Sequence, residues 1–335
     1  MSSLLSQTPL SVLDLAPLRE GGSVSDAFRD TLDLARHAER WGYRRYWLAE
    51  HHNIPGIACS ATSVLIGYVA GGTSSIRVGS GGVMLPNHAP LVVAEQFGTL
   101  EALYPGRIDL GLGRAPGGDS AAARALRREL HDDEFDILLA ELRAYLDSPK
   151  PGQSVHAYPG EGAGVPIWLL GSSGYSAELA GHLGLPFAFA GHFQPDNMEG
   201  ALALYRDRFR ASLHLQRPHA MACVPVIAAD TGEHARLLAT TAQRKFLNLI
   251  RNRPTYLMPP SHDFDWSPAE EAAVASKLRA AIVGSAASVQ HQLESLLATI
   301  QVQELMIVTD TFHHADRLRS YELVASLAAQ PASPL

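Results

Sequence analysis

The sequence of 335 residues has little cysteine and no long apolar run. Its two cysteines, Cys59 and Cys223, lie far apart; a disulfide between them is possible, but isolated buried thiols in a reducing compartment are the favoured interpretation. No run reaches the roughly 18 apolar residues of a membrane span, and the first residues lack the basic segment of a secretory signal. We therefore expect a soluble, cytoplasmic protein without a membrane partner.

A concentrated basic patch is also missing. The chain carries 27 Lys and Arg against 34 Asp and Glu, a net charge of -7, and its densest basic stretch (residues 124–128) is followed by the acidic residues 132–134. This balance argues against nucleic acid as the main partner. The 46% apolar composition is ample for a large core, and the length suits two ordinary domains or one large barrel.

Short apolar runs alternate with longer amphipathic ones along most of the chain. The short runs are apolar on both sides of the pleat, which is typical of a parallel sheet covered on both faces. They span residues 10–15, 43–49, 76–85, 107–112, 166–170, 186–190, 221–228 and 304–309. Helical patterns span residues 25–41, 58–72, 90–103, 119–147, 174–184, 195–213, 231–250, 286–299 and 315–329.

Eight strands, each followed by a helix, predict one α/β domain over residues 1–335, a closed (β/α)8 TIM barrel. A doubly wound sheet with a second domain is the alternative, although no clean linker is visible. Two insertions interrupt the alternation, near 149–165 and 251–280. On a barrel, segments of this length are lids or binding loops, or simply mobile insertions.

The active site of a barrel lies at the C-terminal ends of its strands. The second strand runs into Glu50, His51, His52 and Asn53. Adjacent residues of an extended chain point to opposite sides, so both histidines cannot easily bind one ion, and we expect no metal. A polar strand end without chemistry is one interpretation; a histidine that handles a proton or faces a substrate is preferred.

Three glycines interrupt the third strand, at positions 79, 81 and 82. Glycine weakens a strand, so another requirement must account for them. A bulge or tight packing would explain them, and so would a flat ligand that approaches the main chain.

The next two strand ends carry groups suited to an anion. The glycines at 111 and 113 resemble the start of a dinucleotide fingerprint, but Pro116 occupies the third glycine position, and we reject that match. Arg114 is better interpreted as an anion ligand than as a surface arginine. The small residues from Gly171 to Ser176 open a helix, whose free N–H groups and hydroxyls would suit a phosphate, although a plain serine N-cap explains the same residues.

Taken together, these strand ends resemble the luciferase-like monooxygenase family. The resemblance covers about residues 8–328 and rests on four motifs in order: WLAEHH over 47–52, VGSGGVMLP over 78–86, YPGRIDLGLGRA over 104–115 and LGSSGYS over 170–176. The later IVGS over 282–285 resembles the closing segment of the family. The resemblance implies a (β/α)8 barrel that uses reduced FMN or, in some branches and less favoured here, the deazaflavin F420.

The resemblance also implies roles for individual residues. A cis peptide bond is implied between Gly81 and Gly82, beneath the flavin, and His51 matches the histidine treated as catalytic in luciferase. Arg114 matches the family's phosphate-binding arginine. The other residues that we expect at the cofactor are Gly171, Ser172, Ser173, Gly174 and Ser176, of which Ser173 and Ser176 match phosphate-binding hydroxyls.

The sequence departs from luciferase itself at two informative positions. Ser172 stands where luciferase has a glutamate beside the phosphate serine, and Gly113 stands where the family has a cysteine near the reactive side of the flavin. Oxidation of a fatty aldehyde with emission of light is therefore not implied. The non-luminous members of the family are the better match.

The resulting hypothesis is a two-component monooxygenase. A separate flavin reductase would supply FMNH2, transiently or by diffusion, and a flavin C4a-peroxide would oxygenate a small organic substrate. We expect His51 and His52 to be catalytic, Asn53 and Met84 to lie on the substrate side, and the chain to form a homodimer. The alternatives are an F420-dependent oxidoreductase on the same fold and a non-catalytic flavin-binding protein.

Overall fold

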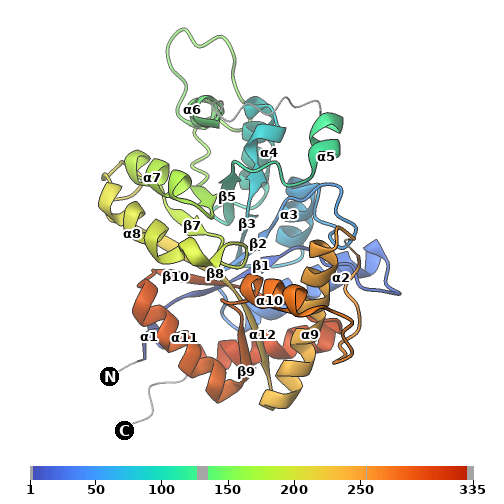
Figure 1. Ribbon diagram of the computed structural model, residues 1–335. Helices are drawn as coiled ribbons and strands as arrows, with labels where there is room; N and C mark the ends of the chain where they lie inside the picture. The colour runs from blue at the N-terminus through green and yellow to red at the C-terminus, as the bar shows by residue number, and fades with distance from the viewer. Residues whose placement is uncertain (1–2, 127–134, 254, 330–335) are drawn as a thin grey trace.

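Eight parallel strands close into a barrel at the centre of the molecule (Figure 1). The structure is a computed structural model that describes residues 3–126, 135–253 and 255–329. The barrel closes because β10 pairs with both β1 and β8. Its strands are β1 (Leu10–Asp14), β2 (Arg45–Leu48), β3 (Arg77–Ser80), β5 (Ile108–Gly113), β6 (Ile167–Gly171), β7 (Phe187–Phe189), β8 (Ala220–Ala229) and β10 (Glu304–Val308).

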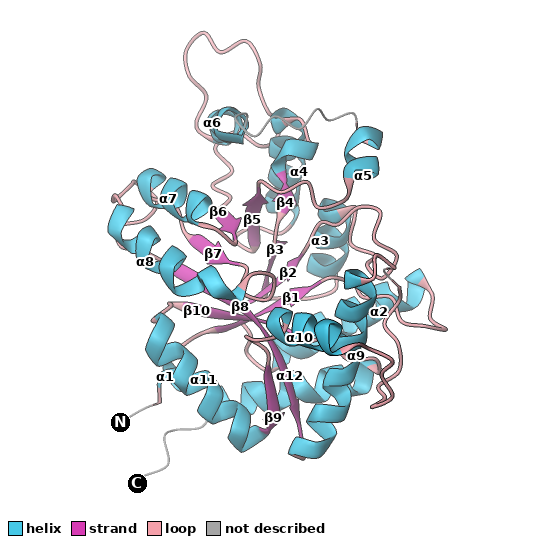
Figure 2. Cartoon of the chain, viewed as in Figure 1, coloured by secondary structure: helices cyan, strands magenta, loops and turns pink. Residues whose placement is uncertain are grey.

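Helices surround this barrel, as expected for alternating strands and helices (Figure 2). Among the described residues, the longer helices are α2 (Val24–Arg40), α3 (Thr62–Gly71), α4 (Pro90–Leu103), α6 (Phe135–Leu146), α7 (Gly174–Leu183), α8 (Met198–Arg208), α9 (Gly232–Ile250), α10 (Pro268–Lys277), α11 (Ala286–Ile300) and α12 (His314–Ala329). Shorter ones are α1 (Leu4–Gln7), α5 (Ser120–Ala125), η1 (Leu85–Asn87) and η3 (Pro195–Asn197). The fold class predicted from the sequence is confirmed.

The helix ends are set by local sequence. In α2, the Ser23 side chain accepts a hydrogen bond from the backbone of Asp26, whose carboxylate accepts one from the backbone of Ser23. This reciprocal capping box satisfies N–H groups that the first helical turn leaves free. Just beyond the other end, Gly42 adopts a φ of 82°, which glycine tolerates readily.

The core of the barrel is apolar towards its mouth and polar at its base. Towards the mouth, Leu13 of β1 and Trp47 of β2 are buried, and a Cβ on Gly81 would meet both. At the base, the guanidinium of Arg45 donates to Asp109 at 2.7 Å and to Glu304 at 2.8 Å. Such pairing compensates the cost of burying these charges and keeps them away from the mouth, where the candidate site lies.

The prediction of one continuous strand over 76–85 is wrong, because the strand is interrupted at residues 81–82. Two strands occupy this stretch, β3 and the short β4 (Val83–Met84), which pairs with β5. The bond between Gly81 and Gly82, which separates them, is cis, as the family resemblance implied.

Three further segments differ from expectation. The single helix predicted over 119–147 is two helices, α5 and α6, which bury separate apolar groups: Ala122 and Ala123 in one, Leu139 and Leu142 in the other. Helical periodicity alone had joined them, and residues 127–134 lie outside the described residues. The insertion at 251–280 contains α10, and a strand not predicted as such, β9 (Ile282–Ser285), pairs with residues 226–229 of β8 beyond the barrel.

The structure bears on two expectations, one about the cysteines and one about membrane-spanning helices. Cys59 and Cys223 are both free and buried, so the interpretation as isolated thiols is confirmed. None of the described helices is both long and apolar enough to cross a membrane.

Candidate functional site

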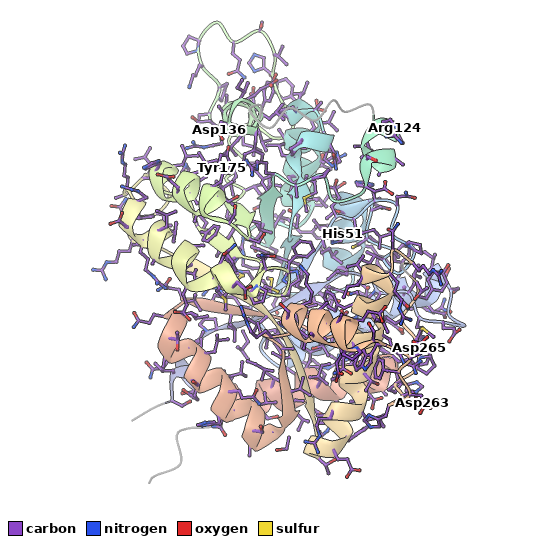
Figure 3. The ribbon with its side chains drawn as sticks, viewed as in Figure 1. His51, Arg124, Asp136, Tyr175, Asp263 and Asp265 are labelled. Atoms are coloured by element: carbon purple, nitrogen blue, oxygen red, sulfur yellow. The ribbon has the colours of Figure 1, made fainter. Side chains whose placement is uncertain are left out.

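A cavity of about 610 Å³ opens at the C-terminal ends of the barrel strands. This volume suits a drug-sized small molecule. Its deep wall comes from strand ends and the residues that follow them, among them Leu15, His51, His192, Pro225 and Asp310. Figure 3 shows His51 near the middle of the molecule, where these strand ends converge. The cavity therefore occupies the position at which barrels place active sites.

Two helices supply apolar side chains to the other walls. From α9, Ala239, Ala242, Phe246 and Leu249 line the cavity, and Val274 of α10 and its C-cap residue Leu278 do so as well. Residues three or four apart share one face of a helix, so each helix turns a single face towards the space. Figure 1 shows α10 beside α9 on one side of the barrel.

The segment between these helices forms the outer rim of the cavity. Its Phe264 and Trp266 rings stack at 3.9 Å between centroids, and both line the space. Arg251, the C-cap residue of α9, donates to Asp265 of this segment at 3.0 Å and to Glu270 of α10 at 2.7 Å. Figure 3 shows Asp263 and Asp265 on this segment, away from the barrel centre. The insertion near 251–280, for which a lid, a binding loop and a simple mobile insertion were all considered, thus contributes to the cavity wall.

The rim also meets the loops that follow β1 and β2. Leu257 donates to Leu18 at 2.7 Å and accepts from Glu20 at 2.8 Å through the backbone. Gly56 lies so close to Thr255 that an added Cβ would meet the Thr255 carbonyl oxygen at 2.6 Å. Only a residue without a side chain permits this approach of the two backbones.

A lysine–carboxylate pair forms the polar part of the cavity wall. Lys245 Nζ donates to Asp310 at 2.7 Å, and both residues are only partly exposed. The imidazoles of His51 and His192 line the same space. Burial, and then the charge of Lys245, lowers the pKa of His51, and the same causes lower the pKa of His192 to about 4. Both rings are thus favoured in the neutral form.

His51 is held in place through its backbone. Its N–H donates to Cys59 at 3.0 Å, and the N–H of His52 donates to Gly117 at 2.8 Å. The first bond ties the strand end to the loop that leads into α3, and the second ties it to the segment after β5. The side chain of His51 reaches the cavity wall, whereas His52 turns to Glu50, 2.8 Å away.

Glu50 is a buried hub that links β2 to the segment after the cis bond. Its carboxylate lies 2.9 and 3.0 Å from His88 Nε2, accepts from the backbone of Met84 at 3.0 Å and accepts from the Asn87 amide at 3.1 Å. Burial raises the pKa of this carboxyl, but the bonds to His88 and His52 outweigh it, so the pKa is lowered. Glu50 is therefore a charged anchor for residues 84–88.

The groups predicted to bind an anion, called the anion cradle below, come together where β5 and β6 end. Arg114 follows β5, and its guanidinium lies over the Tyr175 ring at 4.1 Å. Tyr175 occupies the first turn of α7 and donates to Asp136 at 2.5 Å, a pair visible in Figure 3. The N-cap residue Ser173 makes no capping hydrogen bond through its side chain to any described residue. The N–H groups of that turn remain available to an anion.

The remaining predicted cofactor residues gather around the same turn. Ser176 is buried, and a Cβ on Gly171 would meet its Oγ at 2.6 Å, so the strand end and α7 approach closely. The backbone oxygen of Ser172 accepts from the Asn197 amide at 3.5 Å. The structure thus brings Arg114 to the helix start that holds the predicted serines.

The glycines of the third strand are surrounded by protein on the side where a Cβ would point. A Cβ on Gly81 would meet Leu13 at 2.8 Å, and one on Gly82 would meet the carbonyl oxygen of Gly111 at 2.8 Å. The packing explanation considered from the sequence is thus supported at both positions. Because protein atoms already fill the side where a Cβ would point, a flat ligand could approach these two glycines only along their backbone.

Neither residue expected on the substrate side belongs to the cavity wall. Asn53 has a φ of 57°, is exposed and donates to Asp119 at 2.9 Å. Met84 packs by Gly113, where an added Cβ would meet its sulfur at 2.7 Å. Of the apolar residues that follow β2, Ile54 and Ile57 do line the space.

Of the polar residues that line the cavity, sequence reasoning identified His51 but missed others, three of which are informative. His192 and Asp310 each come shortly after a barrel strand, β7 and β10, so the strand-end rule could have found them. Lys245 lies inside α9, next to the apolar Phe246. Nothing in the local sequence distinguishes it from a solvated helix lysine.

Comparisons with known proteins agree with this geometry. A model of the luciferase-like monooxygenase family matches residues 8–323. A protein of Escherichia coli K12 named luciferase-like monooxygenase is 53% identical over 93% of this chain and 95% of its own length. The N-acetyl-S-alkylcysteine monooxygenase of Bacillus subtilis is 35% identical over 96% of this chain and 99% of its own length.

Solved structures share the fold. The apo-MsnO8 crystal structure superposes with a TM-score of 0.87 at 34% identity, covering 98% of this chain and all of that one. More distant chains show a likeness in fold alone. The oxygenating constituent of 3,6-diketocamphane monooxygenase from Pseudomonas putida, solved with FMN, has a TM-score of 0.76 and 16% identity, with full coverage of both chains. An F420-dependent secondary alcohol dehydrogenase has a TM-score of 0.73 and 13% identity, covering 96% of this chain and 99% of its own.

Proposed function

This chain belongs to the luciferase-like monooxygenase family, and on that premise we propose that it oxygenates a small organic substrate with reduced FMN from a separate flavin reductase. The observation that carries the proposal is that one barrel mouth holds both an anion cradle, at Arg114 and α7, and an apolar cavity walled by His51. A phosphorylated flavin needs the first, and an organic substrate needs the second.

The residues present fit the phosphate end of FMN. The guanidinium of Arg114 brings a full positive charge beside the positive end of a helix dipole, and the Ser173 hydroxyl is not used as a cap by the described residues. Ser176 would add a hydroxyl from the second position after Gly174. The backbone at Gly81 and Gly82 would support the flavin ring, and Gly171, Ser172 and Gly174 would shape the turn around the phosphate.

Bound reduced FMN would supply the activation of molecular oxygen, which protein side chains cannot perform unaided. The chain itself would orient the substrate and exclude water, because the cavity walls are mainly apolar and the rim segment lies over them. Neutral His51 would accept or return a proton at the deep wall, with His52 and Glu50 behind it. Asn53 and Met84 would contribute from outside the cavity, by holding the adjoining loops.

The test is a titration of the protein with FMNH2 and, separately, with reduced F420, each in the absence of oxygen. We expect FMNH2 to bind and riboflavin to bind more weakly, since riboflavin lacks the phosphate. Oxygen admitted with a flavin reductase and a substrate panel should then give oxygenated product. Tight binding of F420 alone would instead assign the chain to hydride transfer. Flavin binding without product would leave a non-catalytic flavin-binding protein.

A further inference from the structure

The polar groups of the cavity are divided between its rim and its deep wall. His262 and Glu271 line the space but are exposed, so solvent screens them. His51, His192, Gln243, Lys245 and Asp310 are less exposed and form the deep polar groups. Only the deep groups would meet a substrate in a dry environment, where charges and hydrogen bonds have their largest effect.

The deep wall already balances its own charge. Lys245 and Asp310 form a 2.7 Å pair, and Asp310 is held ionised, since the adjacent Lys245 and the more distant Arg317 lower its pKa against the effect of burial. The two histidines are neutral at neutral pH, as their lowered pKa values show. A charged group of a substrate would lose its hydration on entering the cavity, and no unpaired charge of the deep wall would compensate that loss.

The same wall still offers hydrogen bonds. An ammonium has three N–H donors, and Asp310 accepts one from Lys245, so the others can face the cavity. His192 Nδ1 is buried and has no hydrogen-bond partner among the described residues. A neutral group such as a carbonyl, amide or hydroxyl can use these sites or the uncharged amide of Gln243, which also lines the space, whereas the other enclosed walls are apolar.

From this balance we infer that the cavity selects uncharged, mainly apolar substrates with one neutral polar group, and that the Lys245–Asp310 pair determines this selectivity. The inference rests on the proposed function, because it takes the cavity to be the substrate site. It goes further by naming the substrate class and two specificity-determining residues.

Three probes of equal length test the inference: 6-phenylhexanamide, 6-phenylhexanoate and 6-phenylhexylamine. Each is titrated without flavin, followed by calorimetry and by the tryptophan fluorescence of the protein, to which Trp266 in the cavity wall contributes. In the parent protein we expect the neutral amide to bind at least about tenfold more tightly than either ion, the effect of about 1.4 kcal/mol. Equal or tighter binding of the carboxylate or the ammonium would overturn the inference, without any variant being needed.

Two substitutions should then redirect the preference in opposite senses. Asp310→Asn leaves Lys245 unpaired, so the carboxylate should gain about tenfold or more and become the tightest probe. Lys245→Met leaves Asp310 unpaired, so the ammonium should gain by a similar factor. The double variant removes both charges and should restore the amide to first place. A preference that stays the same in Asp310→Asn would remove the pair as its determinant.

These measurements are independent of the cofactor. If the probes follow the expected order but no flavin supports turnover, the proposed function fails and the selectivity stands. If the enzyme oxygenates a substrate but the probes bind without regard to charge, only the inference fails. Circular dichroism and thermal melting of each variant, compared with the parent, establish that the binding changes come from a folded protein.

Discussion

The guanidinium of Arg114 lies over the ring of Tyr175, 4.1 Å from its centroid, at the first turn of α7. An arginine that stacks on an aromatic ring keeps its N–H groups at its edges free for an anion. Tyr175 is itself fixed by Asp136, and burial followed by this hydrogen bond raises the pKa of its phenol to about 12. The stack therefore orients a cation at the helix start without neutralising it.

Replacement of Arg114 by alanine should weaken FMN binding by very roughly 10- to 100-fold, because a charge-assisted hydrogen bond contributes about 1.5–3 kcal/mol. Riboflavin binding should be weak in the parent and unchanged in the variant, because riboflavin lacks the phosphate. Fluorescence titration of both flavins measures the difference. The smaller losses are expected for Ser173→Ala and Ser176→Ala.

Arg124→Ala is the matched control for this experiment. Arg124 is exposed on α5, and its loss changes the net charge by the same amount without touching the cradle. FMN affinity should fall only in the Arg114 variant. Equal losses for FMN and riboflavin, or equal losses in both variants, would show that the phosphate is held elsewhere.

His51→Ala should leave FMN affinity nearly unchanged and cut coupled turnover by about 100- to 10,000-fold, the range of a positioned acid or base. Product formation and oxygen uptake measure this. The control is His262→Ala, since His262 lines the exposed rim of the same cavity. Turnover that survives the loss of His51 would remove it from the chemistry.

The same histidine gives a pH dependence with a defined direction. Burial and the charge of Lys245 lower the pKa of His51, so the neutral ring persists below the ordinary histidine value. If the neutral form is the active one, kcat/KM should fall with acid only below that value. Lys245→Met removes the second largest of these causes and should move the acid limb to higher pH. An unmoved limb would assign it to another group.

Glu50→Gln tests how much the buried carboxylate of Glu50 contributes to the free energy of unfolding. The pKa of Glu50 is lowered in the folded protein, so its contribution is present above the unfolded value of about 4.3 and is lost as the pH falls through the folded value. At neutral pH the variant should be less stable by about 1.5–3 kcal/mol, the worth of a hydrogen bond to a charged group. Urea unfolding should show that the difference in free energy of unfolding between the parent and the variant becomes smaller below about pH 4.

Glu178→Gln provides the comparison for this measurement. Glu178 pairs with Arg208 at 3.5 Å, and both side chains are nearly half exposed, so its loss should cost less than about 0.5 kcal/mol. A gap for Glu50→Gln that is as small as this, or that does not change with pH, would contradict the role of Glu50 as a charged anchor.

Much of the fold follows from the sequence for a physical reason. Strands that are buried on both faces consist of continuous apolar runs. Each of the eight barrel strands overlaps one predicted strand, and none extends more than one residue beyond it at either end. The errors fall where a short element depends on tertiary context. The strand β9 has four residues, and it forms because β8 extends beyond the barrel and offers it an edge.

The site was predictable only where one strand end carries its own signal. Arg114 and the turn before α7 were predicted in this way, and the structure brings them together, while their role in binding a phosphate stays a prediction. The Lys245–Asp310 pair joins residues 65 positions apart, from α9 and from the end of β10, and no local pattern relates them. Asn53 was placed on the substrate side by its neighbours in sequence, but a positive φ turns it towards Asp119.

The close approach of Gly56 to Thr255 provides a last prediction, on how the rim is held. In Gly56→Ala the new Cβ would lie 2.6 Å from a backbone oxygen, so the two loops must separate. Overpacking of this kind costs about 1–3 kcal/mol, and the cavity wall at Thr255 should move with it. Urea unfolding should show the loss of stability, and 6-phenylhexanamide should bind more weakly. Gly200→Ala is the control, because Gly200 lies in α8 with open space around it and should gain about 0.4–1 kcal/mol. If both substitutions stabilise the protein, the contact between the two loops does not constrain the rim.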